Sequence, residues 1–377
     1  MKKRVLQFIG SFHQGGTECQ AVSLIRLLKD EGSFEVFAAT LNNVGVLRTE
    51  INDLGLPEIP EFPLTSFYNV NFVRQVRRCA KYLRDNKIDI VHTHDFYTNV
   101  FGMAAATLAG VQVRVASKRE TGGMRSGAQK LVEKIAFGRA DAIIVNSSAV
   151  RGHLTERAIP SAKIHIIYNG IDLKRFGVAD DRASVCSRFG LPNDENMHFV
   201  TMVANLRHKV KNVPMFLRMA KRVVENHPDV HFVIAGEGEL ETELKELAER
   251  LGVAENVHFI GRCVDVPALL SISSVCVLTS IAEGFSNSIL EYMAAGNPVI
   301  ATNVGGAAEA VAEGETGFLV TSDNDAAMAD RLIELLEDEG KATVFGAVGK
   351  RVASEKFSQE AQLRATVELY NSLLKQK

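Results

Sequence analysis

The chain has 377 residues, 46% of them hydrophobic and 23% charged, which is an ordinary globular composition and enough for two α/β domains. No apolar stretch reaches the length of a membrane span. The five cysteines are scattered without a CxxC pair, which argues against structural zinc and for a reducing compartment, the cytoplasm. The net charge is −2, but residues 1–172 carry 22 basic and 16 acidic residues whereas residues 173–377 carry 21 and 29. The basic first half suggests an anionic partner, with an unevenly charged solvated surface as the alternative.

The first predicted strand, residues 4–9, is followed by a glycine-containing turn and an amphipathic helix. Basic residues before this apolar run imitate a signal peptide, but the run is too short and lacks a cleavage site. Gly15 and Gly16 let the backbone approach a phosphate or a sugar, and a tight turn that needs glycine is the simpler alternative. The turn is not GxGxxG, and no ribose-binding acid follows the second strand, which excludes a dinucleotide oxidoreductase.

A basic amphipathic helix is predicted over residues 71–86. Apolar residues repeat at helical spacing on one side, and the other side carries Arg74, Arg77, Arg78, Lys81 and Arg84. Such a helix is able to lie on an anionic membrane, which would make the protein peripheral to the inner face of that membrane. An ordinary surface helix of a doubly wound fold is the simpler alternative, and we prefer it.

Polar residues follow two of the predicted strands of the first half. One strand ends in His92, His94 and Asp95, and a later strand ends at Ser117, shortly before Arg119. Ligands of open parallel sheets collect outside this edge, so we expect contacts to an acceptor molecule, or plain strand-end packing. A metal site is disfavoured, because the two histidines share a face only until the strand ends and no further ligand cluster is evident.

The strand–helix pattern restarts after residue 172, where the composition becomes polar and we place a domain boundary. The strand at 198–204 precedes a loop with three cations just before a helix: Arg207, Lys209 and Lys211. A helix dipole disfavours cations at this end, so a bound phosphate is preferred to solvated charge as the explanation. Two later strand ends carry Gly236 and Arg262.

The most informative stretch is EGFSNSILE at residues 283–291. A buried strand precedes it, and a helix starts at 286–288 and ends at Gly296, a predicted left-handed residue. Free backbone N–H groups at the start of that helix favour an anion. Glu283 on the loop and Glu291 on the helix are both able to reach a ligand whose phosphates rest on the helix end.

These features together resemble the retaining glycosyltransferases of the GT-B fold, family GT4, over essentially the whole chain. The residues that carry the resemblance are Gly15-Gly16, the Arg207/Lys211 loop and the E-x7-E signature Glu283…Glu291 inside EGFSNSILEYMAAGNPVIATNVGG. The resemblance implies an α/β fold of two doubly wound Rossmann-like domains that face each other across a cleft. The expected domains are an acceptor-side domain at 1–172, a nucleotide-sugar domain at 173–355, and a helix at 356–377 that crosses back to the first domain.

The family also implies roles for single residues. The expected donor-binding residues are Gly16, Arg207, Lys211, Gly236, Arg262, Glu283, Phe285, Ser286, Asn287 and Glu291. Arg207 and Lys211 would bind the diphosphate, Glu283 would face the donor sugar, and Glu291 would bind the ribose. Two cations and a helix dipole would stabilise the leaving diphosphate as Mg²⁺ would, so neither metal nor cofactor is expected. Asp323-Asn324-Asp325 imitates a metal-binding DxD motif, but we interpret it as helix capping.

One departure concerns the first domain. Many relatives have a histidine at the end of the strand that here finishes at Ser117, and this chain has none at 117–120. Arg119 or His94 would take that role. The expected catalytic residues are therefore Glu283, Arg119 and His94, with His94 and Asp95 at the acceptor.

The expected function is retaining transfer of a sugar from a nucleotide-diphosphate sugar to a glycan or lipid-linked glycan, in polysaccharide or glycolipid synthesis. No nucleic acid partner is expected. Two alternatives stay open: a GT-B epimerase acting on a sugar nucleotide, and an inactive GT-B binding subunit, which the missing histidine would favour. The sequence does not specify the donor base, the donor sugar or the acceptor.

Overall fold

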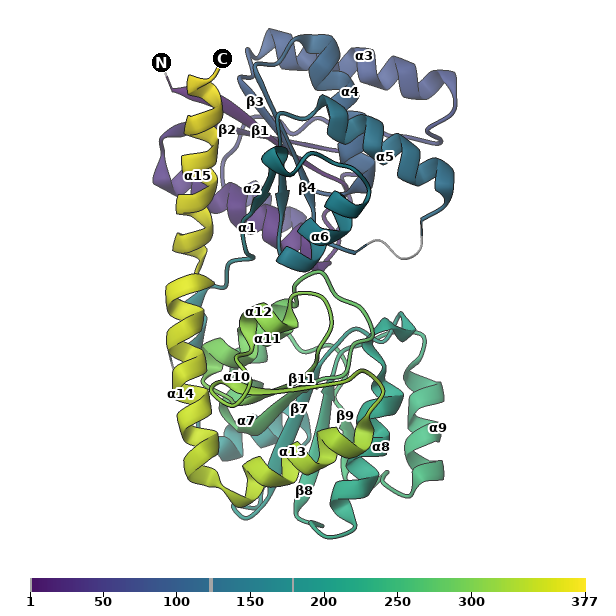
Figure 1. The fold of residues 1–377 in the computed structure, drawn as a ribbon, viewed down its shortest axis with the longest axis vertical. Coiled ribbons are helices and arrows are strands. Elements are labelled where there is room, and N and C mark those ends of the chain that lie inside the picture. The colour runs from purple at the N-terminus through teal and green to yellow at the C-terminus, as the bar shows by residue number, and fades with distance from the viewer. Residues whose placement is uncertain (1, 122–124, 178–179) are drawn as a thin grey trace. The chain divides into compact units, whose positions relative to one another are not determined.

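The computed structural model describes residues 2–121, 125–177 and 180–377 of the chain (Figure 1). The chain forms two compact units. Unit 1 comprises Met1–Gly170 and Gln359–Lys377, and unit 2 comprises Ile171–Ser358. Each unit is built around one six-stranded sheet.

The sheet of unit 1 has the strand order β2-β1-β3-β4-β5-β6, and the neighbouring strands are parallel. Its strands are β1 (Lys3–Ile9), β2 (Phe34–Thr40), β3 (Ile90–Thr93), β4 (Val113–Lys118), β5 (Ala142–Val145) and β6 (Ile164–Ile166). Its helices are α1 (Gly16–Glu31), α2 (Arg48–Asp53), α3 (Val70–Asp85), α4 (Phe96–Ala109), α5 (Gly127–Arg139), α6 (Ser148–Glu156) and α15 (Gln359–Lys375), with the 3-10 turn η1 (Ser161–Lys163).

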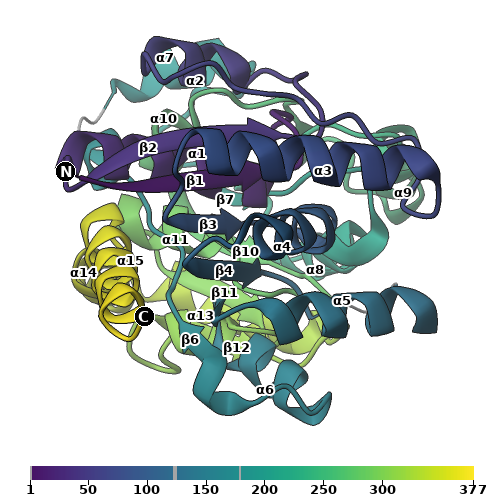
Figure 2. The same ribbon diagram turned by 90° about the horizontal axis from the view of Figure 1, so that it is seen from above.

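Helices cover both faces of this sheet, because alternate residues of each strand point to opposite sides. Leu6 and Phe8 of β1 pack in one core with residues of α3, α4 and α5, which lie beside one another (Figure 2). Val5 and Ile9 pack in a second core with residues of α1 and α15. The last helix of the chain is therefore part of the core of unit 1, although it follows unit 2 in the sequence.

The sheet of unit 2 has the order β12-β11-β10-β7-β8-β9 and is also parallel. Its strands are β7 (His198–Val203), β8 (Val230–Ala235), β9 (Val257–Phe259), β10 (Ser273–Leu278), β11 (Val299–Thr302) and β12 (Gly317–Val320). Its helices are α7 (Arg182–Phe189), α8 (Val213–Val224), α9 (Glu241–Leu251), α10 (Val266–Ser271), α11 (Asn287–Ala295), α12 (Ala307–Ala310), α13 (Asp325–Glu337) and α14 (Glu339–Lys356), with the 3-10 turns η2 (Leu173–Phe176) and η3 (Lys209–Lys211).

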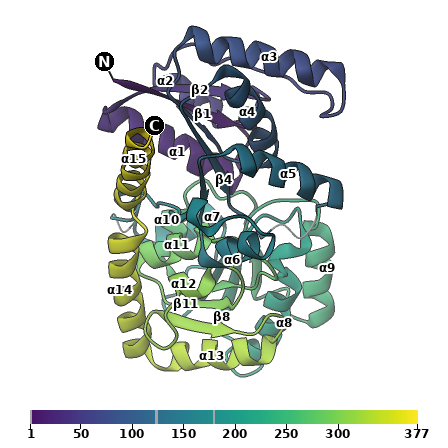
Figure 3. The same ribbon diagram turned by 45° about the horizontal axis from the view of Figure 1, so that its top comes forward.

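The predicted fold class, two doubly wound parallel sheets, is confirmed by this topology. Several local predictions are confirmed as well. Gly296 ends α11 in the left-handed conformation, with φ of 85°. Asn324 caps α13 by accepting a hydrogen bond from Ala327 N, so the DxD-like triplet does cap a helix. The chain turns sharply between α13 and α14 at Asp338, which caps α14 (Figure 3).

Asp325 of the same triplet is engaged by cations of α8. Its carboxylate accepts from Arg218 Nε at 3.0 Å and from Arg222 Nε at 2.7 Å. Across the described residues, no helix is long and apolar enough to cross a membrane.

Candidate functional site

The loop at residues 205–212, between β7 and α8, is held in place by backbone contacts of unit 2. Leu206 N donates to Glu237 O at 2.9 Å. A Cβ on Gly238 would lie 2.2 Å from the carbonyl carbon of Leu206, and one on Gly236, at φ of 156°, would lie 1.8 Å from Ala204 O. Only glycine fits at these two positions, so Gly236 lets the two loops pack together.

Lys211 and Glu283 form an ion pair at the carboxyl end of the sheet of unit 2. Lys211 Nζ lies 2.5 Å from Glu283 Oε1, and each side chain is 15% exposed. Ser280 Oγ donates to the same carboxylate oxygen at 2.7 Å, and Thr279 Oγ1 donates to Lys211 O at 2.8 Å. The structure thus brings together a cation and an acid that the sequence places 72 residues apart.

The backbone of the Glu283 loop rests on a second glycine pair. Gly306 N donates to Gly284 O at 2.9 Å. A Cβ on Gly305, which has φ of 57°, would lie 2.2 Å from Glu283 O. Since any side chain at Gly305 would push this loop away, the glycine fixes the position of Glu283 relative to the sheet.

The N-terminus of α11, a helix of nine residues, follows Glu283 closely in the chain, and the positive end of its dipole favours an anion. Ser286 is its N-cap residue, but its side chain makes no capping hydrogen bond, and its buried Oγ has no hydrogen-bond partner among the described residues. Ser288 Oγ instead donates to Val203 O at 2.9 Å, and Tyr292 Oη accepts from Val203 N at 2.7 Å. These two bonds fix α11 against the end of β7.

Other predicted donor residues lie in different environments. The Phe285 side chain is 5% exposed and packs on Phe357, with ring centroids 5.3 Å apart, so only its backbone is left to meet a ligand. Arg207 is 59% exposed, lies 3.7 Å from Glu237, and is not brought into contact with Glu283. Arg262 is also exposed.

Glu291 is a partly exposed carboxyl on α11 with an altered proton affinity. Burial raises its pKa to about 7, and the charge of Arg175 opposes that rise. A carboxylate has two acceptor oxygens, which suit the two hydroxyl donors of a diol.

Unit 1 contains a cavity of about 590 Å³ at the carboxyl end of its own sheet. Three predicted site residues line it, His94, Asp95 and Arg119. The start of α1 also contributes to its wall, after Gly15 and Gly16. Gly16 itself is the first residue of α1, and Gly15 caps the helix without a side-chain bond.

His94 and Arg119 both carry a buried nitrogen without a hydrogen-bond partner in the described part of the chain: His94 Nδ1 and Arg119 Nε. His94 Nε2 lies 2.7 Å from Gln7 Oε1, and Arg119 Nη1 donates to Asn169 Oδ1 at 2.6 Å. Burial holds the pKa of His94 well below its usual value, and it lowers the pKa of Arg119 to about 10 against the charge of Glu18. The cavity therefore combines a neutral imidazole with a guanidinium cation.

Asp95 is occupied as the N-cap of α4. Its Oδ1 accepts from Thr98 N at 2.9 Å, and Asp95 N donates to Thr98 Oγ1 at 3.0 Å, which completes a capping box. A Cβ on Gly10 would lie 2.7 Å from Asp95 Oδ2, so glycine is needed beside this carboxylate.

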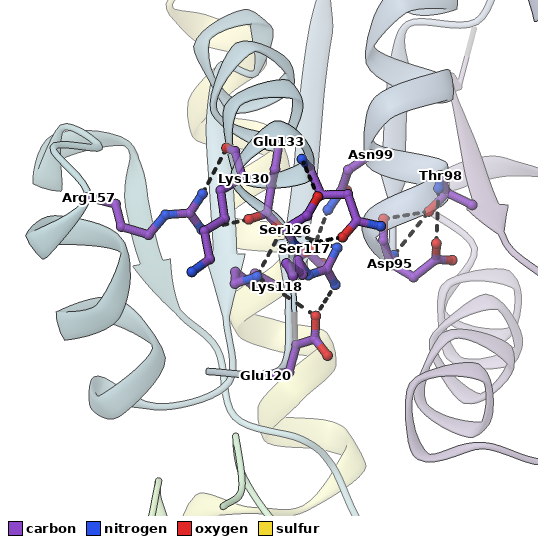
Figure 4. A network of polar contacts seen from close by, with 12 residues as sticks. Asp95, Thr98, Asn99, Ser117, Lys118, Glu120, Ser126, Lys130, Glu133 and Arg157 are labelled. Carbon is purple, nitrogen blue, oxygen red and sulfur yellow. Dashed lines mark hydrogen bonds and ion pairs between the residues drawn. The ribbon is translucent and has the colours of Figure 1, made fainter. Parts of the chain in front are cut away.

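A buried ion-pair network beside this cavity has no counterpart in the sequence prediction (Figure 4). Lys118 Nζ lies 2.8 Å from Glu133 Oε1, with side chains 2% and 1% exposed, and Arg157 Nη1 lies 2.7 Å from Glu133 Oε2. Arg125 forms an ion pair with Glu120, and its guanidinium carbon lies 4.0 Å from the centroid of the Phe96 ring. A glutamate on an amphipathic helix ordinarily faces solvent, so the pattern gave no signal for Glu133.

Comparison with known proteins identifies both halves of the chain. The model described as glycosyl transferases group 1 matches residues 187–352, and the model described as glycosyltransferase family 4 matches residues 14–175. The chain is 30% identical over 249 residues to the lipopolysaccharide core biosynthesis mannosyltransferase LpsB of Rhizobium meliloti (strain 1021), covering 64% of this chain and 68% of LpsB. It is 30% identical to the UDP-Gal:alpha-D-GlcNAc-diphosphoundecaprenol alpha-1,3-galactosyltransferase of Escherichia coli, covering 72% of this chain and 73% of that enzyme.

Solved structures share the fold along the whole chain. The crystal structure of Alr3699/HepE from Anabaena in complex with UDP has a TM-score of 0.86 at 21% identity and covers 99% of this chain and 100% of that one. The glycosyltransferase from Rickettsia africae ESF-5 has a TM-score of 0.87 at 21% identity, with full coverage of both chains. Together with the family models and the curated relatives, this likeness shows that the chain belongs to glycosyltransferase family 4, the group 1 glycosyl transferases, with the GT-B fold.

Proposed function

We propose that this glycosyltransferase moves a hexose from a nucleotide-diphosphate sugar to a hydroxyl of a glycan acceptor with retention of the anomeric configuration. The observation that carries the proposal is the pair of Lys211 and Glu283, 2.5 Å apart, on a loop that leads into the N-terminus of α11. A cation and a helix N-terminus suit a diphosphate, and the adjacent acid suits the sugar attached to it.

The donor diphosphate would lie at Lys211 and at the first turn of α11. The unpaired Ser286 Oγ and the backbone N–H groups of Phe285 and Asn287 would supply further hydrogen bonds. Arg207, exposed on the same loop as Lys211, would reach the diphosphate by exchanging its contact with Glu237. Glu291, with a pKa of about 7, would bind the ribose hydroxyls.

Electrostatics would account for the chemistry without a metal ion. A departing diphosphate gains negative charge, and preorganised donors and cations stabilise that charge in the transition state. Glu283 would stabilise the positive charge that develops on the sugar, and the departing phosphate would take the acceptor proton. Gly16 at the start of α1, Gly236 and Arg262 complete the proposed donor-binding set.

The acceptor would bind in the cavity of unit 1. His94 Nδ1, a buried lone pair of a neutral imidazole, is suited to accept a hydrogen bond from a sugar hydroxyl. Arg119 would supply positive charge there. Asp95 would contact the acceptor only through the part of its carboxylate that the capping box leaves free. The relatives from Rhizobium meliloti and Escherichia coli act in lipopolysaccharide core synthesis and on a diphosphoundecaprenol-linked sugar, which supports a glycan or lipid-linked glycan as acceptor.

The transfer assay is the test of this function. Purified protein is incubated with UDP-, GDP- and ADP-sugars and a panel of oligosaccharide or lipid-linked acceptors. We expect release of one nucleoside diphosphate that depends on acceptor, and a product whose anomeric proton coupling in NMR matches that of the donor. An epimerised sugar nucleotide without transfer would show the epimerase instead, and tight donor binding with no turnover would show a binding subunit.

Helix α3 supplies a proposed contact with an anionic membrane. Its cations, Arg74, Arg77, Arg78, Lys81 and Arg84, lie close to exposed apolar residues, because Val70 is 77% and Val73 is 47% exposed. Part of the charge is already neutralised, since Lys81 Nζ lies 2.5 Å from Asp85 Oδ2. Cations near an anionic bilayer contribute about 1 kcal/mol each, so the unpaired ones matter most.

Reversing Arg74 and Arg77 to glutamate is therefore expected to lower binding to vesicles of anionic phospholipid by about tenfold or more. Co-sedimentation with those vesicles measures the effect. The matched control reverses Lys130 and Lys134, two exposed lysines of α5. Equal binding by both double variants and the unaltered protein would remove the membrane contact from the account.

A further inference from the structure

Tyr370 of α15 lies at the centre of a buried hydrogen-bond chain that reaches two residues of the cavity in unit 1. Gln7 Nε2 donates to Tyr370 Oη at 3.0 Å, and Gln7 Oε1 lies 2.7 Å from His94 Nε2. On the other side, His92 Nδ1 lies 2.6 Å from Tyr370 Oη, and His92 Nε2 lies 2.7 Å from Ser117 Oγ. These five side chains belong to residues that are at most 1% exposed.

The directions of these hydrogen bonds follow from the one donor whose role is fixed, the Gln7 side-chain NH₂ group. Because Gln7 Nε2 donates to Tyr370, the amide oxygen of Gln7 is the acceptor that faces His94. His94 Nε2 must then carry the proton. A neutral imidazole has one N–H, so His94 Nδ1 keeps its lone pair, and that nitrogen is the one without a partner among the described residues. His94 also lines the cavity.

The second branch agrees with the first. Tyr370 Oη accepts a hydrogen bond from Gln7, so its own O–H is free to donate to His92 Nδ1. His92 Nε2–H then donates to Ser117 Oγ, another residue of the cavity wall. Burial, and then the charge of Arg119, lowers the pKa of His92 to about 3, so this imidazole is neutral. Its single N–H is therefore the one on Nε2, which faces Ser117 Oγ.

We propose that Tyr370 is a positioning residue, whose hydroxyl holds the Gln7 amide in the orientation that leaves His94 Nδ1 as an acceptor facing the cavity. The inference deepens the proposed function, on which it rests, because a hydrogen bond accepted by His94 Nδ1 would orient the acceptor hydroxyl before its proton passes to the departing phosphate. The opposite tautomer of His94 would present an N–H, which competes for the hydroxyl oxygen instead of accepting its hydrogen.

The hydroxyl of Tyr370 couples the Gln7 amide to His92, so the amide cannot turn over alone. Turning the Gln7 amide over would point its oxygen at Tyr370 and its NH₂ at His94 Nε2, and both imidazoles would have to change tautomer with it. Without the Tyr370 hydroxyl, Gln7 Nε2 and His92 Nδ1 lose their shared partner. The amide is then no longer coupled to His92 and is free to turn, so His94 is able to adopt either tautomer. The ring of Tyr370, which packs edge-on against Phe34, would stay in place in a phenylalanine variant.

The tautomer is measured directly by two-dimensional 15N–1H NMR of the imidazole nitrogens in the wild-type protein without substrate. We expect His94 Nε2 to show the shift of a protonated nitrogen and Nδ1 that of an unprotonated one. A protonated Nδ1 on His94 would overturn the proposal without any variant. This measurement needs no turnover, so a wild-type protein that transfers no sugar would defeat the proposed function and leave the tautomer result standing on its own.

The variant Tyr370→Phe tests the consequence, with Tyr82→Phe of α3 as the matched control and Gln7→Met as a second route to the same disturbance. We expect both chain variants to show mixed His94 tautomers and a kcat at least tenfold lower, with the KM for the donor unchanged. Tyr82→Phe is expected to leave both readouts unchanged. A fall in kcat with an unaltered His94 tautomer would mark Tyr370 as merely structural and overturn the proposal, as would unchanged kcat in variants whose tautomers are mixed.

Discussion

Replacing Lys211 with alanine is expected to lower the kcat for sugar transfer by about 10²–10³-fold, the cost of removing one preorganised charge-stabilising donor from a transition state. The ammonium of Lys211 faces Glu283 at 2.5 Å. Its loss would remove a cation from the leaving diphosphate and would also leave the Glu283 carboxylate unpaired beside that anion. Steady-state release of the nucleoside diphosphate measures the effect.

Two variants of the same turn make this prediction specific. Lys209→Ala removes an exposed cation two residues away and is expected to change kcat by less than about threefold, the size of a screened surface charge effect. Lys211→Arg keeps the charge and should recover part of the activity. Equal losses for Lys209→Ala and Lys211→Ala would show that the turn supplies only a general positive field.

The largest effect on stability is expected for Glu133→Ala. Glu133 is 1% exposed at its side chain and holds Lys118 at 2.8 Å and Arg157 at 2.7 Å (Figure 4). Its loss leaves the buried Lys118 ammonium with only the exposed Glu120 carboxylate, 3.9 Å away, and about 3–5 kcal/mol of destabilisation is typical when a buried pair is broken. The cations hold the pKa of Glu133 below its usual value against the effect of burial. Urea denaturation at pH 7 measures the change in free energy of unfolding.

The double variant Lys118→Met/Glu133→Leu is the informative companion. It removes both charges of the 2.8 Å pair and replaces them with apolar side chains of similar volume, which is often neutral for a buried ion pair. We therefore expect it to be more stable than Glu133→Ala alone. Glu156→Ala, an exposed acid at the end of α6, should change stability by less than about 0.5 kcal/mol. A Glu133→Ala protein as stable as Glu156→Ala would show that the network adds nothing to the fold.

Local signals explain why the fold was predictable. Short β-branched runs followed by glycine turns and amphipathic helices recur through the sequence, and such alternation permits little besides parallel sheets. The Lys211 loop was conspicuous because its cations oppose the dipole of the following helix. Glu283 and the start of α11 were marked by a glycine and three capping residues in a row. The structure shows that only Ser286 of these sits at the N-cap, while Ser288 bonds to Val203.

The rest of the site depends on long-range contacts that leave no local mark. The hydroxyl of Tyr370 hydrogen-bonds to Gln7 and His92, which are 363 and 278 residues away in the sequence. The residue spacing in the last helix therefore indicates an apolar face but not these hydrogen bonds. In the sequence, Glu133 looks like an ordinary charged residue of a surface helix. Its ion-pair partners in the buried network, Lys118 and Arg157, lie on other elements and are not marked by local spacing. Arg207 shares a loop with Lys211, but its exposed side chain lies near Glu237, a contact that the spacing of the cations did not predict.

The central claim is that α11 and the Lys211 loop bind a nucleoside diphosphate. Amide hydrogen exchange measured with and without UDP, GDP or ADP tests it most directly. The account predicts that one of the three slows exchange at the N–H groups of residues 286–288 and 209–212, and that Lys211→Ala weakens this protection while Lys209→Ala retains it. Two results would contradict it. One is that every nucleotide that slows exchange does so only outside these two segments, and the other is that none of the three slows exchange at concentrations up to millimolar.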